Sequence, residues 1–448
     1  MHNTTTAGLV LFGDYTQRAV SDIAFDLNDP TTIPLRIGHR PMKTLFNGTY
    51  TDHLTLHVCQ DQACNRPLEG SPLSITLTYT ITGTDPATGL TGPPADPDAT
   101  ALTVQSQVAL THDVRDAEYS RSLDRIVMAA AYPANALYVY DVATGTEQSV
   151  ALTKTPTAVS ISPDGLTAAV GHDELISIVD LTQVGQASAP APTQFNVSAK
   201  VFDIVLDGRG RAHVIPDIAD SDQRTEVHTI DIATGSEQLS NLASNLFGRT
   251  YGRLHPSGNF MFIGDPLLSP SNIGKWDVTG PAATYVTEAS FDMAYIGACG
   301  NVWFNESGSH VYSQCGPVFS PDAPPNTQLS QLGRLVLSGP ELTQDHYTIA
   351  WMDQFEPRHE IALIEANASW CGMPVFGVAC YHRLGILDSN DFTRHALHAL
   401  APLTVDGQVY SQRGLFVFYK SDGSSKFLLS RLDAISDPVA EYYLSVLE

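Results

Sequence analysis

The sequence predicts an all-β protein in which a small β-sandwich precedes a seven-bladed β-propeller. Three observations support this prediction. Thr, Ser, Gly, Pro, Val and Leu are plentiful, and only 16% of the 448 residues are charged, a composition typical of short strands joined by tight turns. Apolar and polar residues alternate with period two in many segments. From about residue 101, a strand–turn–strand unit recurs roughly every 45 residues.

The charge balance excludes some classes of partner. The chain has 24 basic and 48 acidic residues, a formal net charge of −24. This charge repels phosphate backbones and anionic lipids, so we expect no nucleic-acid partner. No apolar run approaches the roughly 20 residues that span a bilayer, so no membrane insertion is expected. The first residues lack the pattern of a secretory signal, so the protein is either cytosolic or has lost a signal peptide.

Residues 1–82 are expected to form the sandwich. Segments 22–29, 32–40, 48–61 and 71–82 alternate apolar and polar residues, and turn signals such as Asn47-Gly48 separate them. This pattern predicts about five to seven antiparallel strands. The stretch V-C-x-D-x-x-C at 58–64, followed by Gly-Ser-Pro at 70–72, resembles the immunoglobulin-like modules of large secreted and surface proteins of bacteria. The resemblance implies a spacer role.

Residues 83–100 are expected to be a linker. Their sequence, GTDPATGLTGPPADPDAT, is rich in Pro, Gly, Asp and Thr. Proline fixes φ and removes hydrogen-bond donors, which favours a semi-extended segment over a folded one. We therefore place a domain boundary here, with the propeller spanning residues 101–448.

The repeat defines seven units. Segments 141–148 and 231–238 are near copies separated by two repeats. An aspartate closes an apolar strand in most units, at Asp141, Asp180, Asp231, Asp277, Asp388 and Asp433. A turn signal occurs once in each unit, at residues 120–123, 162–165, 207–210, 255–258, 305–308, 356–359 and 411–414. Four-stranded units of this kind cannot bury both faces alone, and a ring of seven leaves few open edges.

The second unit also carries a family resemblance. Segments 137–165, LYVYDVATGTEQSVALTKTPTAVSISPDG, and 175–181, LISIVDL, resemble the seven-bladed propellers of the Tyr-Val-Thr-Asn (YVTN) class. That class is common in extracytoplasmic bacterial and archaeal proteins, and related propellers include lactonases. The likeness is strong over about residues 110–235 and fades toward the fifth and sixth units.

The six cysteines form three sequence-local pairs. They are Cys59 with Cys64, Cys299 with Cys315, and Cys371 with Cys380. No Cys/His set has zinc spacing. Local disulfides in an oxidising compartment explain the pairs better than free buried thiols. We therefore expect an extracytoplasmic protein that is periplasmic, secreted or on the cell surface.

Standard catalytic motifs are absent, but propellers assemble sites from single residues of several blades near the axis. The candidate ligand-binding residues are those expected near the axis at the inner strands: His112, Asp113, Arg115, Asp203, Arg249, Arg253, Asp292, Asp345, His346, Trp351 and Asp353. Such a ring of acidic, basic and aromatic groups could bind a polar ligand or support acid/base chemistry. The structural alternative is that these are solvated funnel residues or partners in ion pairs at strand ends.

Two other sequence features give weaker evidence for a metal site: a pair of histidines and an acidic segment. His395 and His398 share a face only on a helix, so a strand makes them unsuitable as joint ligands. The acidic segment 217–222 could hold calcium but lacks the glycine and final glutamate of a dedicated calcium loop. No cofactor is predicted, and calcium is the one ion considered.

Two functions follow from these observations. The first is a secreted or cell-surface binding or scaffold protein whose propeller presents a site for a protein or carbohydrate partner, with the sandwich as spacer. The second is an enzyme in the propeller funnel, lactonase-like or glycan-processing, with an acid/base or metal site at the axis.

Overall fold

The computed structural model describes residues 2–6, 9–15, 19–25, 34–39, 47–61, 64, 66–82, 99–218, 224–240, 246, 249–264, 273–288, 300–322, 329–337, 347–367, 382–405, 408–432 and 442–448. Apart from one short 3-10 turn (η2, Glu356–Arg358), the regular elements in these ranges are strands. No helix among them has the length and hydropathy needed to cross a membrane. The predicted all-β class is confirmed.

The described N-terminal residues contain six strands in two sheets. They are β1 (His2–Thr6), β2 (Leu9–Tyr15), β3 (Val20–Phe25), β4 (Leu35–His39), β5 (Gly48–Cys59) and β6 (Leu73–Ile81). One sheet has the order β1-β2-β5-β6, and β3 pairs with β4. Val20, Ile23 and Leu54 are buried between the two sheets. The buried Asp52 accepts hydrogen bonds from the Ala19 and Val20 amides, at 2.8 and 3.0 Å, and so fixes the start of β3.

Most of the other strands in the described ranges form seven four-stranded antiparallel units, here called blades 1–7. Blade 1 is β9 (Asp116–Ser120), β10 (Arg125–Ala130), β11 (Ala136–Asp141) and β12 (Thr146–Ala151). Blade 2 is β13 (Ala158–Ile161), both halves of β14 (Thr167–Asp180) and the first half of β15 (Thr193–Leu206). Blade 3 is the second half of β15, β16 (Arg211–Pro216), β17 (His228–Asp231) and β18 (Glu237–Leu239). The long β14 is a folded hairpin, because the Leu181 amide donates to the Leu166 carbonyl at 2.8 Å.

Blade 4 is β19 (Tyr251–Leu254), β20 (Phe260–Gly264), β21 (Ile273–Asp277) and β22 (Thr284–Glu288). Blade 5 is β23 (Val302–Phe304), β24 (Val311–Ser313), β25 (Pro317–Phe319) and β26 (Gln331–Arg334). Blade 6 is β27 (Tyr347–Phe355), β28 (Glu360–Asn367), β29 (His382–Asp388) and β30 (Arg394–Ala399), with the two-residue β7 (Thr100–Ala101) added in parallel. Blade 7 is β33 (Gln412–Tyr419), β34 (Lys426–Leu432), β35 (Tyr442–Leu447) and β8 (Val104–Leu110).

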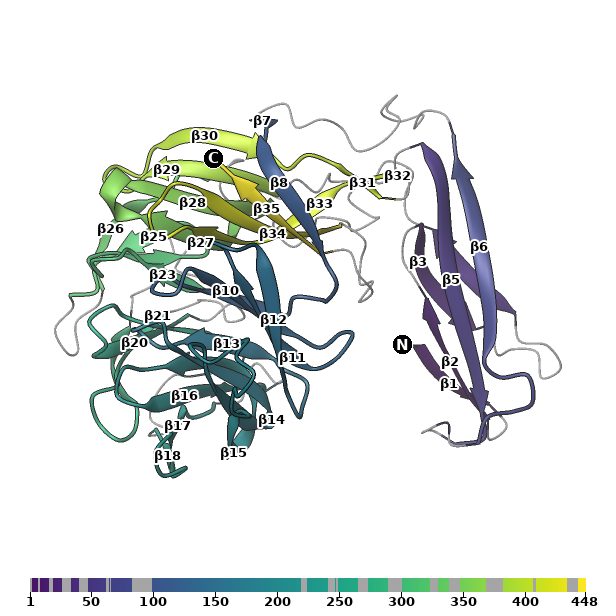
Figure 1. Cartoon of the computed structure of the whole chain (residues 1–448), viewed down its shortest axis with the longest axis horizontal. Coiled ribbons are helices and arrows are strands. Elements are labelled where there is room, and N and C mark those ends of the chain that lie inside the picture. The colour runs from purple at the N-terminus through teal and green to yellow at the C-terminus, as the bar shows by residue number, and fades with distance from the viewer. Residues whose placement is uncertain are drawn as a thin grey trace.

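Consecutive blades pack face to face through apolar clusters. Val127 and Leu137 of blade 1 meet Val170 of blade 2, and equivalent clusters lie between blades 2 and 3, 3 and 4, and 4 and 5. A larger cluster joins blades 5, 6 and 7 to blade 1 through residues such as Trp351 and Phe416. Blade 7 therefore contacts blade 1, and β8 completes blade 7 with a strand from the beginning of the propeller. Figure 1 shows the blades stacked beside the N-terminal strands.

The recurring aspartates shape turns. Asp141, Asp180, Asp231, Asp277 and Asp388 each end the third strand of a blade, whereas Asp433 lies outside the described residues. In the first four, the side-chain oxygen accepts hydrogen bonds from the backbone and hydroxyl of a threonine two or three residues later, at 2.6–3.0 Å. This is the Asx-turn geometry that lets aspartate replace a main-chain acceptor. The repeat signature is therefore scaffold.

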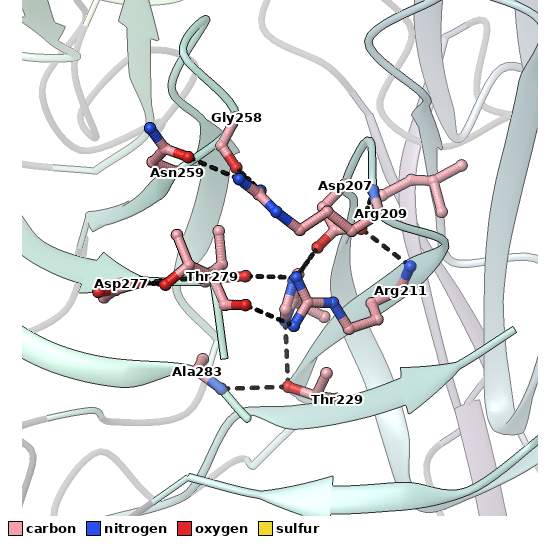
Figure 2. Close-up of polar contacts among 12 residues, drawn as sticks. Asp207, Arg209, Arg211, Thr229, Gly258, Asn259, Asp277, Thr279 and Ala283 are labelled. Carbon is pink, nitrogen blue, oxygen red and sulfur yellow. Dashed lines mark hydrogen bonds and ion pairs between the residues drawn. The ribbon is translucent and has the colours of Figure 1, made fainter. Parts of the chain in front are cut away.

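Side chains from the turns also join neighbouring blades. Arg211 of blade 3 pairs with Asp207 at 2.9 Å and donates to the carbonyls of Val278 and Thr279 in blade 4 (Figure 2). In the same view, Arg209 reaches Gly258 and Asn259 of the next turn. Arg125 of blade 1 repeats the first arrangement by donating to the Leu181 carbonyl of blade 2 at 2.6 Å.

One predicted turn is wrong. Residues 411–414 are expected to be the turn of the seventh unit, but Gln412–Tyr419 form the inner strand β33. The turn lies at 420–423, where the Gly423 amide donates to the Lys420 carbonyl at 2.8 Å and Gly423 has a φ of 68°. The hairpin of β31 (Leu403–Val405) and β32 (Gln408–Tyr410), inserted before β33, displaces the repeat.

The same hairpin contacts the N-terminal sheets. The rings of Tyr50 in β5 and Tyr410 in β32 meet edge to face with centroids 5.8 Å apart. Ala19 and Leu432 are buried in the same cluster. This contact ties the N-terminal sheets to the junction between blades 6 and 7.

Candidate functional site

One cavity lies where the inner strands of the blades begin, and we call it the upper cavity. Its volume is about 480 Å³. Its walls come from blades 1, 4, 5, 6 and 7. They are formed by Val114, Arg115, Asp116, Tyr251, Asn301, Gln314, Ala350, Trp351, Ala366, His382, Arg413, Gly414, Leu415 and Phe416. A cavity of this size and mixed polarity can hold a small organic ligand.

A second, lower cavity lies where the inner strands end. It has a volume of about 260 Å³ and an aromatic lining that includes Tyr119, Trp303 and Phe418. Arg121 of blade 1 crosses this end to reach blades 5 and 6. It pairs with Glu306 at 3.2 Å and Asp353 at 2.8 Å. This ion-pair bridge closes part of the lower end.

A buried ionic cluster separates the two cavities. Arg253 of β19 lies 3.8 Å from Glu118 of β9 and 3.9 Å from Asp203 of β15. Its guanidinium also stacks over the Trp351 ring, with 4.9 Å to the ring centroid. Trp351 lines both cavities, so this stack forms the partition between them.

The carboxyl groups of the cluster are hard to ionise. Burial, followed by the nearby Asp203 charge, raises the pKa of Asp116 to about 7. Burial also raises the pKa of Glu118 to about 8, although the positive charge of Arg253 opposes the shift. The pKa of Asp203 is raised by burial as well. Three carboxyl groups share one arginine here, so protonation removes excess negative charge from a site with little water.

Two of these acids also join blades. Asp116 accepts hydrogen bonds from the amides of Ala117 at 2.9 Å and Val159 of blade 2 at 2.7 Å. Asp203 accepts them from Ile204 at 2.9 Å and Gly252 of blade 4 at 2.8 Å. Asp353 similarly accepts from the Tyr419 amide of blade 7 at 2.7 Å. Each carboxyl therefore satisfies main-chain donors of a neighbouring blade, which is a structural role.

The structure brings some predicted site residues together. Arg115 and Trp351 line the upper cavity, whereas Arg253, Trp351 and Asp353 line the lower one. Asp203 belongs to the ionic cluster between them. Asp113 lies behind Arg115 and pairs with its Nε at 2.6 Å. Asp292, Asp345 and His346 lie outside the described residues.

Two predicted residues lie elsewhere. His112 lines neither of the two cavities. Its ring stacks on Tyr138 of β11 and its Nε2 lies 3.1 Å from Glu147 of β12, so it covers the outer half of blade 1. Arg249 pairs with Asp217 at 2.6 Å and lines neither cavity.

Asp217, one of the residues considered as calcium ligands, already pairs with positively charged side chains. Both carboxylate oxygens of Asp217 contact cations, because Oδ1 binds Arg249 and Oδ2 binds Lys200. Burial opposes ionisation here, but these two partners lower the pKa of Asp217. The rest of the acidic segment, residues 219–222, lies outside the described part of the chain. Across the described ranges, no group of three or more His, Cys, Asp or Glu residues is arranged to hold a metal ion.

The predicted cysteine pairs are confirmed in part. Cys59 and Cys64 are joined by a disulfide, with Cα atoms 5.1 Å apart. Cys315 is also disulfide-bonded, and its expected partner Cys299 lies outside the described residues. Cys371 and Cys380, which the sequence pairs with each other, both lie outside the described residues as well. A bond between Cys371 and Cys380 therefore stays a prediction.

The sequence reasoning missed Asp116 and Glu118. Both alternate with the buried Ala117 in β9, so they face away from the blade core and toward the axis. That alternation is visible in the sequence. The sequence reasoning also missed Arg413 of β33. No comparable pattern points to it, because the residues at the start of this strand have the composition of a turn.

The strand arrangement and the axial cavities define a β-propeller, and comparison with known proteins supports this class. The chain resembles the crystal structure of the Cps50 (Swd1) β-propeller domain from Myceliophteria thermophila, with a TM-score of 0.52 and 11% sequence identity. The match covers 77% of this chain and 98% of the other. At this identity the likeness concerns the fold alone. No protein-family model matches the sequence, and no curated protein matches it.

Proposed function

We propose that this protein is a binding protein whose propeller holds a small ligand in the upper cavity. A propeller fold suggests a binding or scaffold role. The observation that carries the proposal is the cavity of about 480 Å³ whose walls come from five blades. Sites built at the meeting point of several elements are typical of small-molecule recognition.

The contrast between the two ends supports the choice of the upper cavity. The lower cavity is about half as large, and the Arg121 bridge to Glu306 and Asp353 crosses its end. The upper cavity instead presents the half-exposed Arg115 side chain.

The wider setting is part of the same proposal. We assign the propeller to the YVTN class and the N-terminal sheets to the immunoglobulin-like modules, in which they serve as a spacer. The bonded Cys59–Cys64 pair and the bonded Cys315 favour an extracytoplasmic location, because disulfides persist in oxidising compartments.

One observation favours the second candidate, a funnel enzyme. Asp116 lines the upper cavity and has a pKa of about 7, which suits a general acid or base near neutral pH. Its two oxygens, however, already accept main-chain hydrogen bonds. A hydrolase or lyase activity that is lost in Asp116→Asn without a matching loss of stability would favour the enzyme.

A cavity-filling substitution tests the binding proposal whatever the ligand. Ala366 of β28 lines the upper cavity, so Ala366→Trp should fill it and reduce capture of glycan or peptide ligands on arrays at least about tenfold. Ser149→Trp, on the exposed outer strand β12, is the matched control and should leave capture unchanged. Equal capture by both variants, with equal melting temperatures, would place binding outside the upper cavity.

A further inference from the structure

The upper cavity is rich in hydrogen-bond donors. Gln314 Oε1 accepts the Asn301 amide at 3.0 Å, and Asn301 Oδ1 accepts the Val302 amide at 2.8 Å. Both side-chain oxygens are therefore engaged with the main chain. The side-chain NH₂ groups of Asn301 and Gln314 remain as the polar ends available to a ligand.

Arg115 adds further donors to the same cavity. Its Nε pairs with Asp113 Oδ2 at 2.6 Å, while Asp113 Oδ1 accepts the amides of Ala131 and Tyr132 at 2.7 and 2.9 Å. The buried aspartate thus orients the guanidinium through one nitrogen. Within the described ranges the two terminal nitrogens make no hydrogen bond to protein, and the side chain is 51% exposed.

Arg413 brings a second guanidinium to the cavity from blade 7. Across the β33–β34 ladder it lies directly opposite Arg431. The two guanidinium groups make this edge of the cavity positively charged. This concentration of arginine is unusual for the chain, in which acidic residues outnumber basic ones 48 to 24.

Carboxylate acceptors are few among the described residues that line the cavity. Asp116 is the one acidic residue among the described residues of the lining, and its two oxygens already accept the Ala117 and Val159 amides. The remaining walls include the aromatic rings of Tyr251 and Trp351. An acceptor-rich anion with an apolar or ring-shaped body matches this lining.

We propose that the ligand of the upper cavity is a small organic carboxylate, bound by the guanidinium groups of Arg115 and Arg413 and by the side-chain amides of Asn301 and Gln314. This inference rests on the proposed function and adds the ligand class. Guanidinium binds carboxylate through paired charge-assisted hydrogen bonds, which gives both affinity and orientation. The carboxylate can belong to a sugar acid or to the C-terminus of a peptide.

The experiment compares acids with matched neutral compounds. Titration calorimetry on the full chain would use galacturonate oligomers against their amides, and a short N-acetylated peptide acid against its C-terminal amide. The acid of one pair should bind at least about tenfold more tightly than its amide. The pair that shows the difference identifies the source of the carboxylate.

Variants locate the carboxylate. Arg413→Met and Arg115→Met should each abolish the preference for the acid, and Arg413→Lys should keep part of it because the charge remains. Arg209→Met, on the far side of blade 3, is the control. Melting temperatures close to that of the parent protein would show that the variants fold.

Three outcomes would overturn the inference: equal binding of acids and amides, a preference for the acid that survives in both methionine variants, or no binding of any probe. Equal binding that is lost in Ala366→Trp would leave the proposed function standing and remove only the ligand class.

Discussion

The two ends of the propeller axis are built from the same inner strands but differ in charge arrangement. At the lower end, Arg121 has acidic partners in two other blades, Glu306 and Asp353. At the upper end, the partner of Arg115 among the described residues is Asp113, two residues earlier in the chain, which binds Nε and not the terminal nitrogens. An arginine whose partners lie across the axis holds blades together, whereas one anchored from behind is positioned for a ligand.

The largest loss of stability is expected when the ionic cluster between the two cavities is broken. Arg253→Met removes the cation shared by Glu118 and Asp203 and leaves buried carboxyl groups without a charge partner. We expect a loss of about 3 kcal/mol of stability. Arg209→Met, which breaks only contacts between exposed turns, should cost less than about 1 kcal/mol. Urea denaturation followed by tryptophan fluorescence measures both. Equal losses would contradict the ionic partition.

The pH dependence of stability sharpens the same comparison. The pKa of Glu118 is raised from its ordinary value to about 8 in the folded protein, so the folded state binds a proton that the unfolded state has released. The stability that protonated Glu118 contributes is fully present below the ordinary glutamate pKa, and it is lost as the pH rises toward 8. We expect Glu118→Gln to reduce the fall in melting temperature between pH 5 and pH 8, by the equivalent of about 2 kcal/mol.

Glu69→Gln, in an exposed turn of the N-terminal part, is the control for this prediction and should leave the pH profile unchanged. Asp116, with a pKa of about 7, contributes in the same direction and should preserve part of the slope in the variant. A profile that is identical in the parent and in Glu118→Gln would show that Glu118 is ionised throughout.

The smallest loss of stability is expected for a substitution at the lower cavity. Arg121→Ala removes the bridge to Glu306 and Asp353 and the hydrogen bond to the Gln354 carbonyl at 2.7 Å. Because the side chain is 35% exposed, we expect a loss of about 1 kcal/mol. Ligand affinity at the upper cavity should not change. A large loss of affinity with an intact fold would show that the lower end also takes part in binding.

The sequence predicts the repeated architecture well because the repeat is a backbone feature. An aspartate at the end of a third strand and a glycine in a turn impose local geometry, and both recur in blade after blade, as at Asp141 and Asp231. The prediction fails where a segment has the composition of a turn without forming one. Residues 411–414 have that composition but begin an inner strand.

The site is predicted only in part because each blade contributes one or two side chains to it. In the structure, Arg115, Arg253 and Trp351 line the two cavities, and Asp203 contacts Arg253 between them, since strand starts converge there. The sequence alone does not distinguish the orientation of His112 from that of Arg115, three residues later. The His112 ring turns outward and stacks on Tyr138 in β11. Which side chain of a strand start faces the axis depends on packing between blades that are distant in sequence.

The order in which the strands are synthesised gives the pairing of β8 with β35 a further consequence. Leu110 lies opposite Tyr442, so β8 leaves the ribosome with blade 1 but receives its partner only when β35 emerges, more than 300 residues later. Until then, blade 7 lacks an edge and β8 is exposed to incorrect pairing. The contact between β32 and the N-terminal sheets comes from the same late part of the chain. The segment from β31 to β35 therefore completes both assemblies, and native stability is expected only after this segment has been synthesised.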